Sequence, residues 1–207
     1  VEEGYSTDLT TDHALSFIEH RDTNKPFCLL LHHKAPHRNW LANTKYFGMY
    51  DNVTFPMPET FYDDYETRGS AVRTQKMSVT KDMRWEQDFK VPEMLDTANA
   101  DSWDSYLSLM NEVNRMNPEQ RIAWGKYYFP RNRRFLEARL TGKELDEWKY
   151  QNYIRDYMSV IKSVDESVGR VLDYLDSHGL TDNTIIVYTS DQGFYMGEHG
   201  WRSEERR

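Results

Sequence analysis

The stretch from Asp182 to Trp201 reads D-N-T-I-I-V-Y-T-S-D-Q-G-F-Y-M-G-E-H-G-W. Its residues Thr184 to Thr189 are rich in β-branched side chains, which predicts a strand. The strand leads to Asp191 and Gln192, whose carboxylate and amide oxygens suit calcium or magnesium better than zinc. Because open α/β sheets place their sites beyond the carboxyl ends of the strands, this turn is a candidate metal site.

A second strand-and-turn segment lies near the start of the chain. Lys25 to Trp40 reads K-P-F-C-L-L-L-H-H-K-A-P-H-R-N-W, and its apolar run over Pro26 to His32 predicts a strand buried on both faces. The strand delivers Lys34 and His37 to the loop that follows it. Cys28 lies within the apolar run, which favours a small core residue over a reactive thiol.

Helical spacing precedes each predicted strand. Ser6 to Arg21 carries apolar residues at i, i+3 and i+4 on one face. Leu145 to His178 keeps a 3.6-residue apolar spacing, and Gly179 supplies a C-terminal stop. A helix followed by a strand is half of an α/β unit. We therefore predict an α/β fold in which both strand-end loops open on the same edge of one sheet.

The middle of the chain, at about 43–147, lacks sheet-like periodicity and carries most of the turn signals. We expect a long excursion from the sheet with short helices, such as Glu119 to Tyr128. Long ordered excursions in compact domains are often functional. Asp63 and Asp64 form a paired carboxylate in this region, for which a solvated loop is the favoured interpretation.

A local basic cluster also lies in the middle of the chain, formed by Arg131, Arg133 and Arg134. Arginine binds carboxylates and sulfate-like groups through bidentate contacts, so the cluster could hold a sulfated or uronic chain. An ordinary solvated surface is the favoured alternative. From this cluster we keep Arg131 as a candidate substrate-binding residue.

Bulk composition narrows the classes of protein. The chain has 207 residues with 38% hydrophobic and 14% aromatic residues, which is typical of a globular domain. The net charge of −8 argues against nucleic acid as a partner, although a small cationic pocket for a sulfated substrate remains compatible with it. A single cysteine excludes a disulfide framework within the chain. We expect no membrane span, since no apolar run approaches the roughly 20 residues that one requires.

The segment around Asp191 resembles a signature of the formylglycine-dependent sulfatases, which belong to the alkaline-phosphatase-like superfamily. The segment Lys25 to Trp40 is similar to the strand and Lys-x-Pro-His turn of the same family, and the two occur in the family's order. The resemblance implies an alkaline-phosphatase-like mixed sheet flanked by helices, present here only in part. Residues 1–207 would form a partial sulfatase catalytic domain of a periplasmic or extracellular protein.

The resemblance also implies roles for individual residues. Asp191 and Gln192 would bind a calcium ion, and His37 would contact the sulfate and protonate the leaving alkoxide, which is general-acid work suited to imidazole. Lys34 could stabilise sulfate charge through its ammonium group, although the family's best-known sulfate lysines lie elsewhere. His199 and Glu198 lie near the metal loop, where they would orient the site or contact the substrate, a sulfated saccharide. The alternative is that the Gly-rich turn needs them only for its fold.

The second cofactor that the resemblance implies is a formylglycine, made from Cys or Ser in a Cys/Ser-x-Pro/Ala-x-Arg motif that these 207 residues lack. We expect the nucleophile segment and a C-terminal subdomain to lie outside the chain, and these residues alone to hydrolyse nothing. The family usually continues after Trp201 with an aromatic residue, Asp and a sulfate-contacting Lys. This chain instead has Arg202 to Arg207, so we do not assign the lysine's role to Arg202.

The function implied is calcium-dependent hydrolysis of sulfate esters. Among sulfatases, the segments His32 to Trp40 and Pro58 to Gly69 look most similar to bacterial N-acetylglucosamine-6-sulfatases, which act on heparan- or keratan-type glycans. One alternative is a phosphoryl hydrolase of the same superfamily, which would need further His and Asp ligands for two zinc ions. The other is a sulfoglycan-binding relative that has lost its nucleophile.

Overall fold

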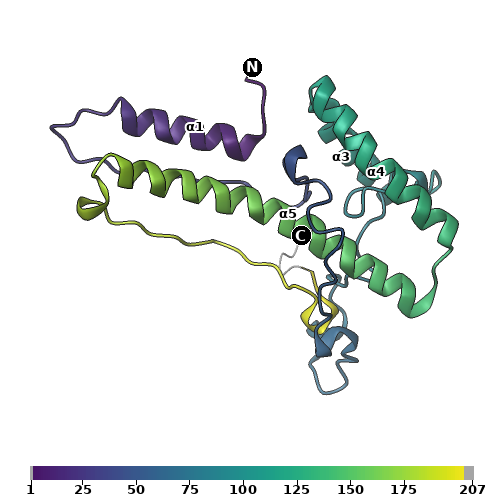
Figure 1. The fold of residues 1–207 in the computed structure, drawn as a ribbon. Coiled ribbons are helices and arrows are strands. Elements are labelled where there is room, and N and C mark those ends of the chain that lie inside the picture. The colour runs from purple at the N-terminus through teal and green to yellow at the C-terminus, as the bar shows by residue number, and fades with distance from the viewer. Residues whose placement is uncertain (1, 203–207) are drawn as a thin grey trace.

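Helices make up most of the regular structure in the computed structural model, which describes residues 2–202 (Figure 1). The α-helices in this part of the chain are α1 (Ser6–Glu19), α2 (Ser70–Arg73), α3 (Ala100–Arg115), α4 (Pro118–Ala138) and α5 (Gly142–Ser177). Single turns of 3-10 helix lie between these helices at η1 (Thr44–Tyr46), η2 (Glu59–Tyr62) and η3 (Pro92–Met94), and two more follow α5 at η4 (Thr181–Asn183) and η5 (Glu198–Gly200).

The longest of these helices, α5, organises the fold. It spans 36 residues and carries buried side chains along most of its length. Its C-terminal stop is the one that the sequence predicts. Gly179 adopts a φ of +64°, and the amide N–H of Leu180 reaches back to the carbonyl of Leu175 at 2.8 Å, as in a Schellman motif. The predicted helix Leu145 to His178 is confirmed, beginning three residues earlier than expected.

Helix α1 lies along the C-terminal half of α5 (Figure 1). Ala14 and Ile18 bury their side chains, while the hydroxyl groups of Thr11 and Ser167 hydrogen-bond to each other across the two helices. The exposed side chains of Asp12 and Arg170 form an ion pair at the same junction. The predicted helix Ser6 to Arg21 is therefore confirmed, and it ends at Glu19.

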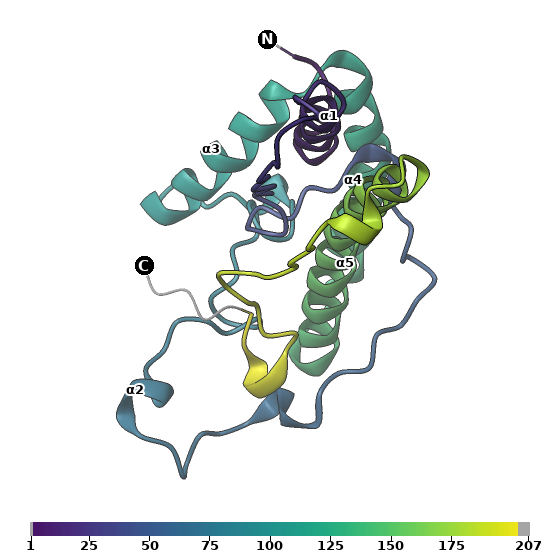
Figure 2. The ribbon, with the colours of Figure 1, turned by 90° about the vertical axis from the view of Figure 1, so that its left-hand side faces the viewer.

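Helices α3 and α4 form a second helical layer (Figure 2). Asn117 caps α4 in a capping box, its side chain accepting from the backbone of Gln120 while the side chain of Gln120 accepts from the backbone of Asn117. The two helices share a small core, and α4 adds residues to the main core against α5. The smaller core comprises Leu109, Val113, Trp124 and Tyr128.

The two predicted strands are absent from the part of the chain that the structure describes. Within residues 2–202 the β-pairing consists of one isolated antiparallel bridge, between Ser78 and Trp201. The segments 26–32 and 184–189 instead run alongside the helices without a neighbouring strand (Figure 1). A strand is defined by backbone hydrogen bonds to a neighbour, so apolar and β-branched composition cannot produce one without that neighbour.

The expectation that residues 26–32 are buried on both faces is also wrong. Burial alternates along this segment: Phe27, Leu29, Leu31 and His33 are half-buried, whereas the residues between them are exposed. This is the two-residue period of an extended chain with one covered face. Cys28 lies on the open face and is exposed, so it is not a core residue in this structure.

No helix in residues 2–202 is both long enough and apolar enough to cross a membrane. Even α5, the longest, places several polar residues among its buried ones. These include Lys149, Gln151, Asn152, Asp156 and Ser159.

Candidate active site

Three loops meet over the N-terminal half of α5, and we call them together the three-loop site. The first is the turn 34–40, the second is the segment 59–66 around η2, and the third is the loop 191–201 that contains η5. In the ribbon views of Figures 1 and 2, η5 lies beside η2, and these two elements make many backbone contacts. The first and third of these loops carry the two strand-end motifs, with His37 and Asp191 respectively.

Trp40 joins the first loop to the third. Its side chain is fully buried, and its ring lies 4.9 Å from that of Tyr153 and 5.7 Å from that of Phe194. The phenol of Tyr153 then donates hydrogen bonds to the carbonyls of Tyr195, at 2.7 Å, and Arg202, at 2.9 Å. Both motif loops are thus fixed to the same turns of α5, although more than 150 residues separate them in the chain.

His37 lies in a tight turn within the first loop. Its amide N–H donates to the carbonyl of Lys34 at 2.9 Å, and its Nδ1 lies 2.6 Å from the carbonyl oxygen of Arg38. The ring is half-buried, while the side chain of Lys34 is exposed. The turn therefore carries an imidazole and an exposed ammonium group, which are side chains able to protonate a leaving group and to neutralise an anion.

A buried carboxylate holds the residue next to His37. Asp88 is fully buried and receives both Nε and Nη2 of Arg38, the latter at 2.6 Å. The amide N–H of Arg84 donates to the same carboxylate at 2.7 Å. Bidentate pairs of this kind combine strength with fixed geometry. This pair could not be predicted from the sequence, because 50 residues separate its members and no local pattern marks Asp88.

Asp191 and Gln192 are exposed at the start of the third loop. The amide nitrogen of Gln192 donates to the carbonyl of Asp191 at 2.7 Å, so the atom of this side chain that could bind a metal ion is the amide oxygen Oε1. A carboxylate and an amide oxygen fit calcium, which takes six to eight oxygen ligands. No group of three or more His, Cys, Asp or Glu residues suited to a metal ion occurs within residues 2–202. Two oxygen donors would fill only part of such a coordination sphere.

His199 is held by the second loop at three points. Its amide N–H donates to Oγ1 of Thr60 at 3.1 Å, its carbonyl accepts from the phenol of Tyr65, and its Nδ1 lies 2.7 Å from Oδ2 of Asp63. The expectation that Asp63 belongs to a solvated loop is thus wrong, since its carboxylate is mostly covered and bound to His199. The adjacent Asp64 is exposed, as expected.

The contacts of Asp63 favour its charged form. The backbone N–H of Tyr65 and, after it, the imidazole of His199 hold the pKa of the Asp63 carboxyl below its usual value. Because the pKa is depressed in the folded state, the associated stabilisation is present above the unfolded pKa of about 3.9. It is lost as the pH falls through the folded pKa.

Gly200 lets the third loop approach the second. Its φ is +71°, and a Cβ atom added there would lie 2.7 Å from the carbonyl oxygen of Phe61. Gly200→Ala is therefore expected to destabilise the protein by more than the roughly 1–2 kcal/mol that a positive φ costs an alanine. Thermal and urea unfolding of the variant measure this loss.

Gly179→Ala is the matched control for that prediction. Gly179 has a φ of +64° with no atom within 4 Å of the added Cβ, so its replacement introduces the backbone strain alone. The difference between the two variants reports the contact with Phe61. Equal losses from Gly200→Ala and Gly179→Ala would contradict the close approach of η5 to η2.

Arg131 does not lie on a basic surface. The structure splits the predicted cluster, because Arg133 and Arg134 are exposed while Arg131 is only 9% exposed. The Arg131 guanidinium stacks 4.6 Å from the ring centre of Tyr128 and donates to the carbonyl of Phe89. A usable signal was present in the sequence: Arg131 falls three residues after Tyr128 and seven after Trp124, on the apolar face of α4.

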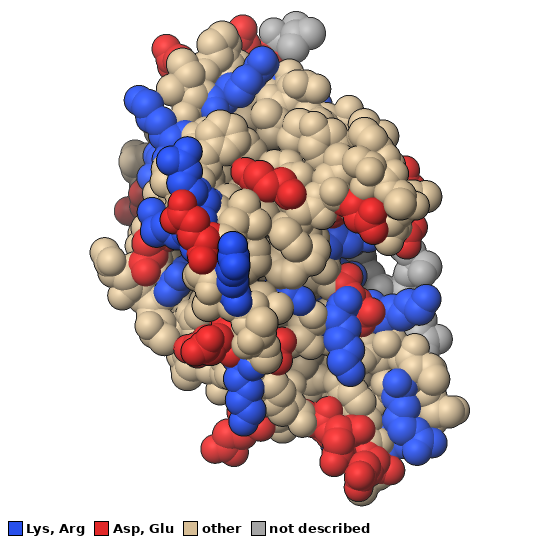
Figure 3. Space-filling view, turned by 90° about the vertical axis from the view of Figure 1, so that its right-hand side faces the viewer, with Lys and Arg blue, Asp and Glu red and all other residues tan. Residues whose placement is uncertain are grey.

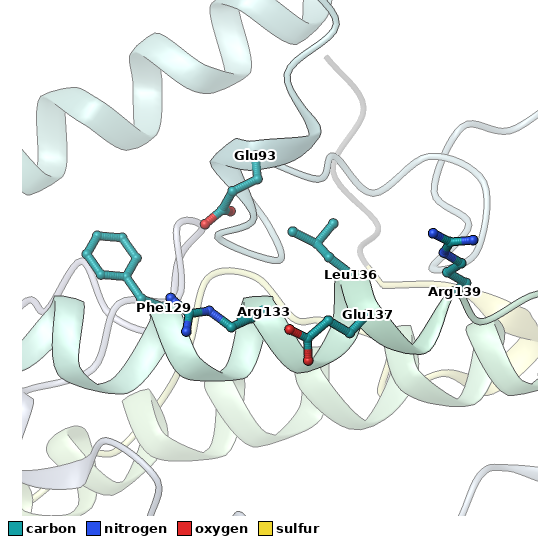
Figure 4. Close-up of a pocket in the computed structure, with 6 residues that line it drawn as sticks. All are labelled: Glu93, Phe129, Arg133, Leu136, Glu137 and Arg139. Carbon is teal, nitrogen blue, oxygen red and sulfur yellow. The ribbon is translucent and has the colours of Figure 1, made fainter.

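The exposed arginines of α4 lie among acidic residues. Figure 3 shows Lys and Arg interspersed with Asp and Glu over the face on the right-hand side of Figure 1. A shallow hollow between η3 and α4 contains two arginines and two glutamates (Figure 4). It is lined by Glu93, Phe129, Arg133, Leu136, Glu137 and Arg139. None of the predicted site residues lines this hollow, so the three-loop site remains the candidate active site.

Comparison with known proteins agrees with the motifs of the three-loop site. The model of the Sulfatase family matches residues 1–206, so this chain belongs to the sulfatase family. It is 47% identical over 205 residues to an N-acetylglucosamine-6-O-sulfatase from Bacteroides thetaiotaomicron, covering 97% of this chain and 35% of the relative. It is also 27% identical over 192 residues to the multifunctional alkaline phosphatase superfamily protein PehA from Trinickia caryophylli, covering 91% of this chain and 27% of that protein.

A solved structure shows the same fold. The structure of BT4656 in complex with its substrate D-glucosamine-2-N,6-O-disulfate superposes with a TM-score of 0.86 at 46% sequence identity. The match covers 98% of this chain and 40% of that one. The chain thus spans between about a quarter and two fifths of the length of these relatives.

Proposed function

We propose that the complete gene product hydrolyses sulfate esters and that its substrate is a glycan carrying 6-O-sulfated N-acetylglucosamine. The observation that carries the proposal is the pairing of the Asp191 loop with the His37 turn through Trp40, in a chain 47% identical to an N-acetylglucosamine-6-O-sulfatase. The structural relative that is bound to a 6-O-sulfated glucosamine supports the same substrate class.

The residues of the three-loop site take distinct parts in this reaction. His37 gives a proton to the departing sugar oxygen, since its turn fixes the orientation of the ring. Lys34 offers an exposed ammonium group to the sulfate oxygens. His199 forms a hydrogen bond to the saccharide. Asp191 and Gln192 hold calcium through their side-chain oxygens.

Calcium and formylglycine complete the proposed site. When both are present, they supply Lewis-acid stabilisation of the sulfate charge and a covalent nucleophile, which divides the hydrolysis into two easier steps. The family's nucleophile motif does not occur in these 207 residues, so we expect this segment alone to be inactive. A periplasmic or extracellular location fits a glycan substrate.

A panel of defined sulfated sugars tests the substrate. The complete gene product, with its nucleophile converted to formylglycine, would be given monosaccharides sulfated at position 6 or 3 of N-acetylglucosamine, at position 6 of galactose, or on the amine of glucosamine. We expect free sulfate from 6-O-sulfated N-acetylglucosamine at a kcat/KM at least about 100-fold above the others, since a site built to bind a polar group rejects analogues strongly. Desulfation of another position alone would reject the substrate assignment.

The same panel addresses the phosphoryl hydrolase alternative. The 27% identity to PehA is the observation that favours testing this alternative. Including the 6-phosphate of N-acetylglucosamine compares the two esters at one position of one sugar. Faster release of phosphate than of sulfate would favour the alternative over the sulfatase.

A further inference from the structure

His199 occupies a backbone conformation that a non-glycine residue rarely adopts. Its φ of 55° and ψ of 22° lie in the left-handed region, where an L-residue carries a cost of roughly 1–2 kcal/mol. Such a conformation persists only where the surroundings enforce it, and it is found most often at functional sites. Here the enforcing contacts are the three hydrogen bonds from the second loop.

Asp63 determines which ring nitrogen of His199 is protonated and which one is left to accept a hydrogen bond from a ligand. Its carboxylate accepts from Nδ1 of His199 at 2.7 Å, which places the ring proton on Nδ1. The neutral imidazole then carries its lone pair on Nε2, and no residue in the described part of the chain is a partner of that atom. The His199 side chain is 33% exposed, so a ligand can reach the ring.

The position of the pair in the fold connects it to the proposed reaction. His199 lies in the same loop as Asp191 and Gln192, and Phe194 of that loop packs on Trp40 of the His37 turn. We propose that Asp63 is a positioning residue for His199, holding it so that Nε2 accepts a hydrogen bond from a hydroxyl group of the saccharide. This inference rests on the proposed sulfatase function and names a further residue of the same site.

Asp63→Asn tests the proposal with little change in shape. The Asn Oδ1 can still accept from the amide N–H of Tyr65, which Asp63 Oδ1 binds at 2.9 Å, so the turn is kept. The amide nitrogen then faces Nδ1 as a donor, which favours the opposite tautomer with the proton on Nε2. We expect KM for 6-O-sulfated N-acetylglucosamine to rise at least about 10-fold, by analogy with the orienting partners of metal-bound histidines. We expect kcat to stay nearly constant, because binding is lost equally from ground and transition states.

Asp64→Asn is the matched control. Asp64 makes the same kind of turn, accepting from the amide N–H of Glu66 at 2.9 Å, but its side chain is exposed. We expect this variant to keep the wild-type KM. His199→Ala is expected to raise KM as much as Asp63→Asn does, and the double variant no further, since the two residues act as one unit. An unchanged KM in Asp63→Asn, or additive effects of the two substitutions, would overturn the proposal.

Two further measurements distinguish a contact of His199 with a hydroxyl group from a contact with the sulfate, and determine the tautomer of the His199 ring. Inhibition by inorganic sulfate should be the same in wild type and Asp63→Asn, and an equal weakening there would assign His199 to the sulfate instead of a hydroxyl. The ¹⁵N chemical shifts of His199 should report a protonated Nδ1 in wild type and a protonated Nε2 in Asp63→Asn. If the proton stays on Nδ1 in Asp63→Asn, the positioning role is overturned. If the wild type releases no sulfate, the proposed function is overturned instead.

Discussion

Replacing Asp191 with alanine is expected to lower turnover of sulfate esters by the complete gene product at least about 100-fold. Loss of a residue that merely orients a metal ligand costs 10- to 100-fold, so loss of a ligand itself should cost more. Because the Asp191 side chain is exposed and makes no hydrogen bond or ion pair within residues 2–202, the loss should come without unfolding. Sulfate release and thermal unfolding, measured on the same samples, check both statements.

Asp182→Ala is the matched control for Asp191→Ala. Asp182 is another exposed aspartate, nine residues earlier on η4, and it carries no predicted ligand role. It should retain wild-type activity. Raising the calcium concentration should recover part of the activity that Asp191→Ala loses. It should leave the activity of Asp182→Ala unchanged. Wild-type turnover by Asp191→Ala at low calcium would contradict the assignment of Asp191 as a ligand.

Replacing Asp156 with alanine is expected to destabilise the protein by about 3–5 kcal/mol, the cost of leaving a buried charge without its partner. Lys90 is fully buried, and its Nζ lies 2.8 Å from Oδ2 of Asp156. Nη1 of Arg131 lies 3.8 Å from the same oxygen. Alanine would therefore leave two cations in the core without a counterion. The midpoint of urea unfolding measures the effect.

The pH dependence of this loss follows from Lys90. Burial lowers the pKa of the Lys90 ammonium group, and the charge of Asp156 opposes that shift. Removing Asp156 should lower the folded pKa further. A depressed folded pKa gives stability that is lost as the pH falls through it, so Asp156→Ala should be least stable at low pH and should recover as the pH rises toward that of free lysine. A loss that does not shrink at high pH would contradict this origin.

Two further variants isolate the buried pair. Asp165→Ala removes an exposed aspartate that pairs with Lys162 one turn away, and it should leave unfolding almost unchanged. Lys90→Met added to Asp156→Ala should restore part of the lost stability, because it removes one of the two uncompensated cations. Independent, additive effects of the two substitutions would show that Lys90 and Asp156 do not interact.

The helices were predictable from the sequence because their signal is local. The apolar spacing of Leu145 to His178 and the glycine after it lie within one segment, and α5 follows them closely. The strands depend on a neighbour that supplies the backbone hydrogen bonds, and neither Pro26 to His32 nor Thr184 to Thr189 reveals whether that neighbour is present. Their composition therefore predicted pairing that residues 2–202 do not contain.

The long-range contacts of the site were not predictable from local patterns. The motif residues His37, Asp191 and His199 were identified from the sequence, and the structure brings their loops together through Trp40. The partners Asp63 and Asp88 carry no local signature, since they reach His199 and Arg38 across 136 and 50 residues. Arg131 was misjudged for another reason. Its charge suggested a surface, whereas its register on α4 placed it against Tyr128.

The most direct test of the central claim follows one sulfate ester by NMR. The complete gene product would be incubated with 6-O-sulfated N-acetylglucosamine, with calcium and again with a calcium chelator, while the signals of the two C6 protons are recorded. We predict that these signals move upfield to the positions of the free 6-hydroxyl sugar when calcium is present and stay in place with the chelator. Signals that never move, or that move equally in the chelator, would contradict a calcium-dependent 6-O-sulfatase.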